Sequence, residues 1–243
     1  MKERVLITGI MGCIGKIISP ALADEYDVCG LDKLAGTVPL VDISDLEQLR
    51  KLFAREKPFQ FLIHLAADSD TNASWELVLK NNIIGTRNVY ACAKEFGVRR
   101  VVFASSNHVT GAYEGFPPSL HTQDNPPIIT VRDPIRPDSY YGASKAWGEA
   151  LARQFYELHG IESICLRIGS VLEDDDPTRN ERTMKTWLSH RDLIQLIRLS
   201  LKTTMGFGIY YGVSANDGGV WDISEVTEEL GFKTVDNAAL LKK

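Results

Sequence analysis

A tyrosine and a lysine four residues apart are the side chains in this sequence best suited to proton chemistry. They are Tyr141 and Lys145, in the stretch SYYGASK that begins at Ser139. Side chains at positions i and i+4 of a helix share one face, so the phenol and the ammonium group would lie together. An isolated phenol has a pKa of about 10, and a neighbouring cation favours the phenolate, which would make Tyr141 a usable general base. The same spacing also occurs on an ordinary helix face with a half-buried tyrosine and a solvated lysine.

A glycine-rich turn near the N-terminus is a second candidate site. Gly9, Gly12 and Gly15 follow a short apolar run at residues 5–8 and lead into a stretch of helical character. Glycines there permit a tight turn and close approach of the backbone to a pyrophosphate, with the helix N-terminus facing the anion. Asp32, seventeen residues after Gly15, can hold both hydroxyls of an adenosine ribose and would repel a 2′-phosphate. The arrangement predicts a dinucleotide site that takes NAD rather than NADP, although glycines also mark plain turns.

Strands and helices alternate around these candidate sites. Strands are expected at residues 5–8, 27–31, 59–65, 101–104, 163–166 and 208–213, and helices at 16–25, 44–55, 75–96, 140–159, 191–202 and 224–230. Ser44 is expected to cap the second helix, with Glu47 as its capping-box partner. Such alternation predicts an α/β fold, a doubly wound parallel sheet of the Rossmann type with helices on both faces, together with a small substrate-binding lobe.

Length and composition are those of an ordinary globular protein. The chain has 243 residues, of which 44% are hydrophobic and 24% charged, and a formal net charge of -5. This predicts a single domain over residues 1–243 and gives no electrostatic reason to expect nucleic acid or an anionic membrane as a partner. Four cysteines without C-x-x-C spacing indicate small buried side chains in a reducing compartment, not disulfides or metal ligands. No apolar run has the length of a membrane span or a signal-peptide core, so a cytoplasmic protein is expected.

Residues 112–138 form the one long stretch without apolar periodicity. It holds six of the ten prolines: Pro117, Pro118, Pro126, Pro127, Pro134 and Pro137. Loops of this length in compact domains are usually functional or mobile. We expect substrate-site segments at residues 106–140 and 170–192.

The order of the motifs resembles that of the short-chain dehydrogenases/reductases, in their extended, sugar-modifying branch. The motifs are TGxxGxxG at 8–15, DI at 42–43, HLAA at 64–67, NxxGT at 82–86, SS at 105–106 and YxxxK at 141–145. The resemblance implies that Ser106 acts with Tyr141 and Lys145 in catalysis, and that His64 is structural. It also implies an NAD site formed by Gly9, Gly12, Cys13, Ile14, Gly15, Asp32, Asp42, Ile43, Leu65, Ala66, Ala67, Asn82, Tyr141, Lys145, Ile168 and Val171.

Four further stretches are similar to the uronate dehydrogenases within that branch. They are ASSNH at 104–108, RIGS at 167–170, WLSH at 187–190 and SAND at 214–217. The resemblance implies that a sugar acid lies against Ser69, Ser106, Asn107, His108, Ser170 and Arg182. Arg182 has a planar guanidinium that suits a bidentate contact with a carboxylate. The acidic run at 173–176 is expected to point outward as a solvated turn, with an inward fold that cancels the charge of Arg182 as the alternative.

These features predict an enzyme that oxidises a hexuronate, glucuronate or galacturonate, at C1 to an aldarolactone with NAD. Tyr141 as phenolate would take the proton of the anomeric hydroxyl, Lys145 would lower the pKa of Tyr141, and Arg182 would hold the substrate carboxylate. An aldose or sugar-phosphate 1-dehydrogenase, a sugar epimerase and a noncatalytic NAD-binding sensor or scaffold are the alternatives. Nucleotide-sugar epimerases share these motifs but resemble chains longer than this one. Noncatalytic sensors of this kind tend to lose the tyrosine or the lysine, and both are present here. The expected partner is a small sugar acid, no metal is expected, and a homo-oligomer is left open.

Overall fold

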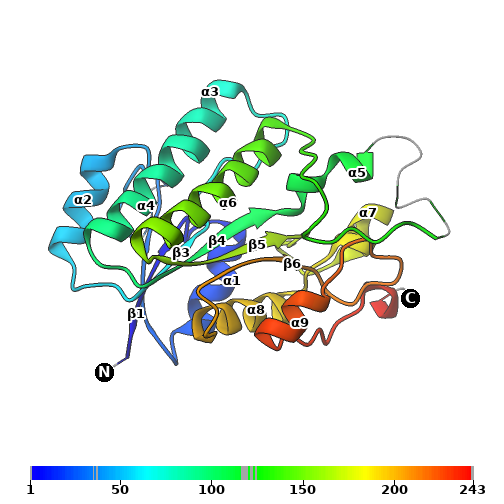
Figure 1. Ribbon diagram of the computed structural model, residues 1–243. Helices are drawn as coiled ribbons and strands as arrows, with labels where there is room; N and C mark the ends of the chain where they lie inside the picture. Colours follow the sequence, from blue (N-terminus) through cyan, green and yellow to red (C-terminus); the bar gives the residue numbers. More distant parts are fainter. Residues whose placement is uncertain are drawn as a thin grey trace.

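A six-stranded parallel sheet forms the centre of the described part of the chain (Figure 1). The computed structural model describes residues 2–34, 36, 38–115, 120, 123 and 125–241. The strand order is β2-β1-β3-β4-β5-β6 and every neighbouring pair is parallel. The strands are β1 (Arg4–Thr8), β2 (Asp27–Leu31), β3 (Phe61–His64), β4 (Arg100–Ser106), β5 (Glu162–Ile168) and β6 (Phe207–Gly212). The predicted doubly wound parallel sheet is confirmed.

Helices cover both faces of this sheet, as Figure 1 shows. On one face lie α2 (Leu46–Arg55), α4 (Gly85–Glu95) and α6 (Tyr140–His159), and on the other α1 (Cys13–Leu22), α8 (His190–Lys202) and α9 (Ser224–Leu230). Successive strand residues point to opposite faces, so Ile63 packs in the α1/α8 layer and Leu62 in the α2/α4/α6 layer. Both layers are apolar because a parallel sheet is buried on both sides.

The expected helix at residues 75–96 has a change of winding inside it. It consists of α3 (Trp75–Val78), a π-helical segment η1 (Leu79–Ile84) and α4. Short π-helical insertions shift the helix face and are frequent near functional sites. Here the shift buries two neighbouring amides, Asn81 and Asn82, against the cleft wall and α6.

The prediction that Ser44 caps α2 is wrong. Asp45 is the N-cap residue, and its carboxylate accepts hydrogen bonds from the backbone N–H groups of Glu47 and Gln48. The Ser44 hydroxyl instead donates to Asp42 Oδ1 over 2.7 Å. Serine and aspartate are comparable N-caps, so the position of a neighbouring acceptor decided between them.

Residues near the proline-rich stretch pack into a small cluster beside the sheet. Residues 112–115 form the short helix α5 (Ala112–Gly115), and Ile129 donates its backbone N–H to Val220 O over 2.7 Å. Ile129 packs with Tyr211, Val220 and Trp221 in a hydrophobic group apart from the two main layers. Pro117 and Pro118 lie outside the described residues.

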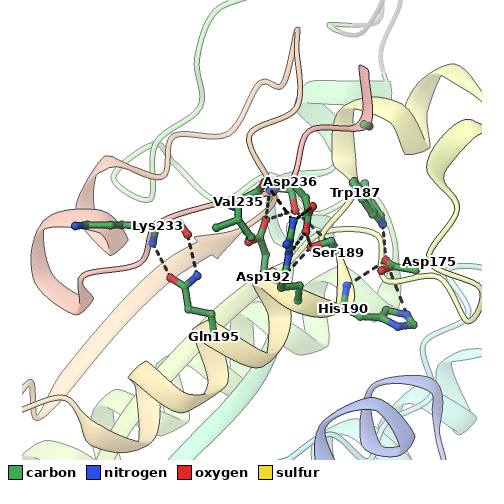
Figure 2. Close-up of polar contacts among 12 residues, drawn as sticks. Asp175, Trp187, Ser189, His190, Asp192, Gln195, Lys233, Val235 and Asp236 are labelled. Atoms are coloured by element: carbon green, nitrogen blue, oxygen red, sulfur yellow. Dashed lines mark hydrogen bonds and ion pairs between the residues drawn. The ribbon is translucent and has the colours of Figure 1, made fainter. Parts of the chain in front are cut away.

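A fully buried carboxylate holds the last part of the chain against α8. Asp192 accepts hydrogen bonds from the Ser214 hydroxyl and from the Val235 backbone N–H, at 2.6 and 2.9 Å, as Figure 2 shows for Val235. The short helical segments that remain are η2 (Asn107–Thr110), η4 (Pro177–Arg179), α7 (Glu181–Thr186) and η5 (Ala238–Leu241). Among the described helices, none is long and apolar enough to cross a membrane.

Candidate active site

A cleft of about 510 Å³ opens at the carboxyl ends of the parallel strands. Strand order reverses between β1 and β3, and ligands of doubly wound sheets bind outside the strand ends at such a switch point. Every residue expected to bind cofactor or sugar lines this cleft except Asn82. Segments that are far apart in sequence therefore meet in one place.

The glycine turn after β1 forms one wall of the cleft. Gly9 has a positive φ of 74°, and a Cβ there would come within 2.8 Å of the Ala66 backbone nitrogen. A Cβ on Gly15 would lie 2.4 Å from the Ile10 carbonyl oxygen, so only glycine allows this close packing. No side chain caps the N-terminus of α1, whose first residues Cys13 and Ile14 line the cleft. Uncapped helix N–H groups beside a glycine turn fit a pyrophosphate.

Asp32 stands at the end of β2 with its carboxylate fixed by the backbone. Its Oδ2 accepts the Met11 N–H over 2.9 Å and its Oδ1 accepts the Leu34 N–H over 3.0 Å. The residue is only 6% exposed yet lines the cleft. A carboxylate held at this strand end fits the ribose of a dinucleotide. Lys33 and Leu34 line the same end of the cleft, so Lys33 lies where it could soften the repulsion of a 2′-phosphate by Asp32.

The Ser–Tyr–Lys group is assembled by β4 and the first turns of α6. Ser106 ends β4, and Ser139 starts α6 by accepting the Gly142 N–H over 3.1 Å. Tyr141 and Lys145 then lie on one face, with Lys145 Nζ 5.6 Å from the centroid of the Tyr141 ring. Lys145 is 4% exposed and donates to Ala104 O over 2.7 Å. The predicted placement of the phenol and the ammonium group together is confirmed.

Burial is the largest influence on the pKa of each member of this pair. Burial raises the pKa of Tyr141, a hydrogen bond with Ser106 lowers it, and the charge of Asp138 raises it further, so that it lies above its usual range. Burial also lowers the pKa of Lys145 to about 7. Lys145 is not among the groups that shift the pKa of Tyr141 here, and its expected lowering of that pKa stays a prediction. The Lys145 ammonium is directed at the Ala104 carbonyl, and desolvation disfavours the charged form of both groups.

A buried ion pair fixes α6 over the sheet. Arg167 Nε and Nη2 each lie 2.9 Å from the Glu149 carboxylate, and these side chains are 2% and 5% exposed. Ser105 Oγ also donates to Glu149 over 2.6 Å. Because Ser105 precedes Ser106 on β4 and Glu149 follows Lys145 by one turn on α6, this cluster sets the spacing of the Ser–Tyr–Lys group.

Asn82 and His64 are structural residues. Asn82 does not line the cleft directly, and its expected part in the cofactor site stays a prediction. Its amide bonds to the backbone of Asp68 and to Ser144 Oγ, which ties the π-helical segment to α6, while Asn81 lines the cleft instead. His64 lies between the Thr8 and Thr86 hydroxyls, and burial lowers its pKa to about 3. The prediction that His64 is structural agrees with this environment.

His108 lies at the far end of the cleft from the glycine turn. Its Nδ1 pairs with Asp138 Oδ2 over 2.6 Å, and its ring meets the Tyr141 ring edge at 5.8 Å between centroids. Burial opposes ionisation of Asp138, but the hydrogen bond and charge of His108 bring the pKa of that carboxyl below its usual range. The pair leaves Nε2 of His108 as the ring nitrogen available to a sugar hydroxyl.

Arg182 lines the same end of the cleft and is paired with an acid. Its Nε lies 3.0 Å from Glu114 Oε2, and its Nη2 donates to Glu114 Oε1 over 3.5 Å. The arginine side chain is 40% exposed and that of Glu114 only 6%. Glu114 lies in the irregular stretch whose pattern singled out no residue, so its role was missed; an acid in an otherwise apolar AYEG helix was the one available signal.

The acidic run at residues 173–176 points outward, as expected. Glu173, Asp174 and Asp176 are exposed, and Asp174 pairs with Arg179. Figure 2 shows that Asp175 turns back to accept hydrogen bonds from the Trp187 indole and the His190 backbone N–H, at 3.0 and 3.1 Å. Asp175 thereby holds the turn beside Ser170, whose hydroxyl contacts Thr186 Oγ1 over 2.6 Å. Among the described residues no cluster of His, Cys, Asp or Glu could hold a metal.

A dinucleotide cradle beside a buried Ser–Tyr–Lys group, on a doubly wound parallel sheet, defines the class of nicotinamide-dependent oxidoreductases. The chain belongs to the NAD dependent epimerase/dehydratase family, whose model matches residues 5–191. Its cofactor is NAD.

Several relatives match nearly the whole chain. An NAD-dependent glucose-6-phosphate dehydrogenase of Haloferax volcanii is 33% identical, covering 98% of this chain and 95% of that protein. A uronate dehydrogenase of Pseudomonas putida is 35% identical (97% and 85%), and an L-arabinose 1-dehydrogenase of Haloferax volcanii is 33% identical (97% and 98%). The crystal structure of a mutant uronate dehydrogenase from Agrobacterium tumefaciens complexed with NAD superimposes with a TM-score of 0.84 at 32% identity (99% and 88%). The chain is an NAD-dependent sugar dehydrogenase by family.

Proposed function

We propose that the protein oxidises a hexuronate at C1 to an aldarolactone. The observation that carries the proposal is the presence of one arginine, Arg182, in the same cleft as Ser106, Tyr141 and Lys145. A guanidinium is the side chain best matched to a carboxylate. The uronate dehydrogenases among the relatives support this substrate class.

Proton removal is assigned to Tyr141. As phenolate it takes the proton of the anomeric hydroxyl while the C1–O bond becomes the lactone carbonyl. Bound NAD supplies the acceptor for the hydride that leaves C1, so the products are the lactone, NADH and one proton. The Ser106 hydrogen bond lowers the pKa of Tyr141 against the effect of burial. Lys145, with a pKa of about 7, holds or releases a proton near neutral pH.

The sugar is oriented by polar side chains around the Ser–Tyr–Lys group. Ser69, Asn107, His108 and Ser170 line this part of the cleft and offer donors and acceptors for hydroxyls. Arg182 uses Nε and Nη2 toward Glu114, which leaves the Nη1 edge of its guanidinium for the exocyclic group at C5. The cofactor is held by Gly9, Gly12, Asp32 and the other cleft residues predicted for it, and Asn82 supports the site through its bonds to Asp68 and Ser144.

A second candidate is a neutral aldose or a sugar phosphate as substrate. The specific observation in its favour is the Arg182–Glu114 ion pair, which cancels the positive charge that would select a carboxylate. The arabinose and glucose-6-phosphate dehydrogenases among the relatives support the same alternative.

The direct test is NADH formation with a panel of sugars. We expect turnover with glucuronate or galacturonate and NAD. Glucose 6-phosphate should react slowly, because its phosphate is larger than a carboxylate, carries two negative charges and would have to bind Arg182 beside Glu114. If the uronates give no NADH while arabinose or glucose does, the aldose candidate replaces the uronate one. The lactone is identified by its spontaneous hydrolysis, which releases acid after the NADH signal.

A further inference from the structure

A continuous line of polar contacts joins the sugar end of the cleft to the catalytic serine. Arg182 bonds to Glu114, and Glu114 Oε1 accepts the Asn107 side-chain N–H over 3.3 Å. Asn107 Oδ1 in turn accepts the Ser106 hydroxyl over 3.3 Å. Glu114 stands at the centre of this line and is 5% exposed.

The positive charge of Arg182 at the cleft is offset by the negative charge of Glu114. Lys145 is directed at the Ala104 carbonyl, and the charged group that contacts the Asn107 amide is Glu114, which in turn pairs with Arg182. Glu114 lies behind the cleft wall, and it meets Arg182 through the Nε side of the guanidinium. A buried carboxylate beside a half-exposed arginine keeps the arginine oriented and offsets its charge. A substrate carboxylate at the Nη1 edge would feel the attraction of Arg182 and the repulsion of Glu114 together.

We propose that Glu114 is a specificity-determining residue: by pairing with Arg182 it lets the site accept a neutral aldose with a hydroxyl at the exocyclic position as well as a uronate. The inference rests on the proposed C1 oxidation and refines its substrate class. The guanidinium edge can also donate hydrogen bonds to a hydroxyl oxygen, and the negative charge of Glu114 offsets much of the Coulombic preference of Arg182 for a carboxylate.

A purely structural role for Glu114 has a different signature. If the carboxylate only held Arg182 and Asn107 in place, its loss would lower kcat/KM for every sugar by the same factor. A role in charge balance changes the ratio of kcat/KM values for a uronate and its matched neutral sugar, because only the uronate carries the second charge. The ratio for galacturonate over galactose, and for glucuronate over glucose, is therefore the quantity to measure.

The experiment compares wild type with Glu114→Gln and Glu114→Asp. Glutamine keeps the shape and the hydrogen bond to Arg182 without the charge, and we expect it to raise the uronate-to-aldose ratio by roughly tenfold or more. Aspartate keeps the charge, and its ratio should stay within about threefold of wild type. The matched control is Glu162→Gln, which removes the carboxylate of the Arg100–Glu162 pair. This pair lies where β4 and β5 begin, away from the cleft at their carboxyl ends, so the uronate-to-aldose ratio should stay unchanged.

Three results decide the proposal. A raised ratio in Glu114→Gln alone supports it, and an unchanged ratio with equal losses for all sugars overturns it. The wild-type ratio is a test that needs no variant: we expect a preference within about tenfold, and a preference for uronates above roughly a thousandfold overturns the inference. That last result would leave the proposed uronate oxidation standing, whereas absence of NADH with every sugar would overturn the proposed function itself.

Discussion

The cofactor half and the sugar half of the cleft differ in how their residues are brought together. In the cofactor half the walls are the turns after β1, β2 and β3, such as the glycine turn and Asp32, and each lies directly at a strand end. In the sugar half the walls come from η2, α6, the 170–172 turn and α7, joined through side chains. Glu114 and Arg182, for example, are separated by 68 residues.

This difference indicates in which half of the cleft substitutions should change substrate choice. Neighbouring parallel strands hold the cofactor half through backbone hydrogen bonds, buried apolar layers and close backbone packing at Gly9 and Gly15. The sugar half depends on a few side-chain pairs, the His108–Asp138 and Arg182–Glu114 contacts among them. Substitutions there should alter substrate choice while leaving NAD binding intact.

The largest expected effect is that of Tyr141→Phe, where the two halves meet. Loss of the hydroxyl removes the proposed general base, so turnover should fall by about 10² to 10⁴ while NAD binding is kept. Tyr140→Phe is the matched control, because Tyr140 is 56% exposed on the same helix and should remain nearly as active as wild type. Steady-state rates and NAD binding by fluorescence give the comparison. Equal losses in both variants would remove Tyr141 from the mechanism.

Arg182→Ala should have the second-largest effect on activity, and it tests the sugar half of the cleft without touching the cofactor half. Uronate kcat/KM should fall by roughly 10² with little change in NAD binding, and Arg182→Lys should restore only part, since an ammonium cannot form the planar contact. Alanine also removes the Arg182 contact of the buried Glu114, so thermal unfolding of the variant has to be measured beside its kinetics. The double variant with Glu114→Gln separates the two effects. A uronate kcat/KM that survives in Arg182→Ala would contradict carboxylate binding by this residue.

Lys145→Met should stabilise the fold while it stops turnover. Burial lowers the pKa of Lys145 to about 7 from an ordinary value of 10.5, so the unfolded chain binds the proton more tightly than the folded one. The charged lysine therefore costs stability fully below pH 7, and this cost fades as the pH rises from 7 toward 10.5. Removing it should raise the free energy of unfolding by on the order of 2 kcal/mol at about pH 6, after the lost bond to Ala104 is subtracted, and by less at about pH 9. Denaturant unfolding at both pH values would show it; a gain independent of pH would not fit this account.

Cofactor preference is the smallest effect and tests the cofactor half. Asp32 should repel a 2′-phosphate, so wild type should use NAD at least about tenfold more efficiently than NADP. Asp32→Ala should narrow that preference, and it should leave the uronate-to-aldose ratio unchanged because Asp32 lies at the opposite end of the cleft. Comparable kcat/KM for NAD and NADP in wild type would show that Lys33 beside it offsets the carboxylate.

Most of the fold followed from local patterns. The helices at residues 140–159 and 224–230 were predicted to the residue, and in the structure Ser139 caps the first while Gly160 and Gly231 end the two helices. The break within residues 75–96 was not predicted, since the apolar pattern there fits one α-helix. It reflects the contact of Asn82 with Ser144, 62 residues away, which no local window contains.

By itself the sequence determined the strand–turn–helix units, the glycine turn, Asp32 and the Tyr141–Lys145 pair, because each depends on spacing within one or two neighbouring elements. Only the tertiary structure decided the electrostatics of the site. Burial raises the pKa of Tyr141, and packing brought Glu114 rather than the acidic turn against Arg182. The physical reason is that desolvation and ion pairing depend on which side chains share a volume, and that depends on chain segments distant in sequence.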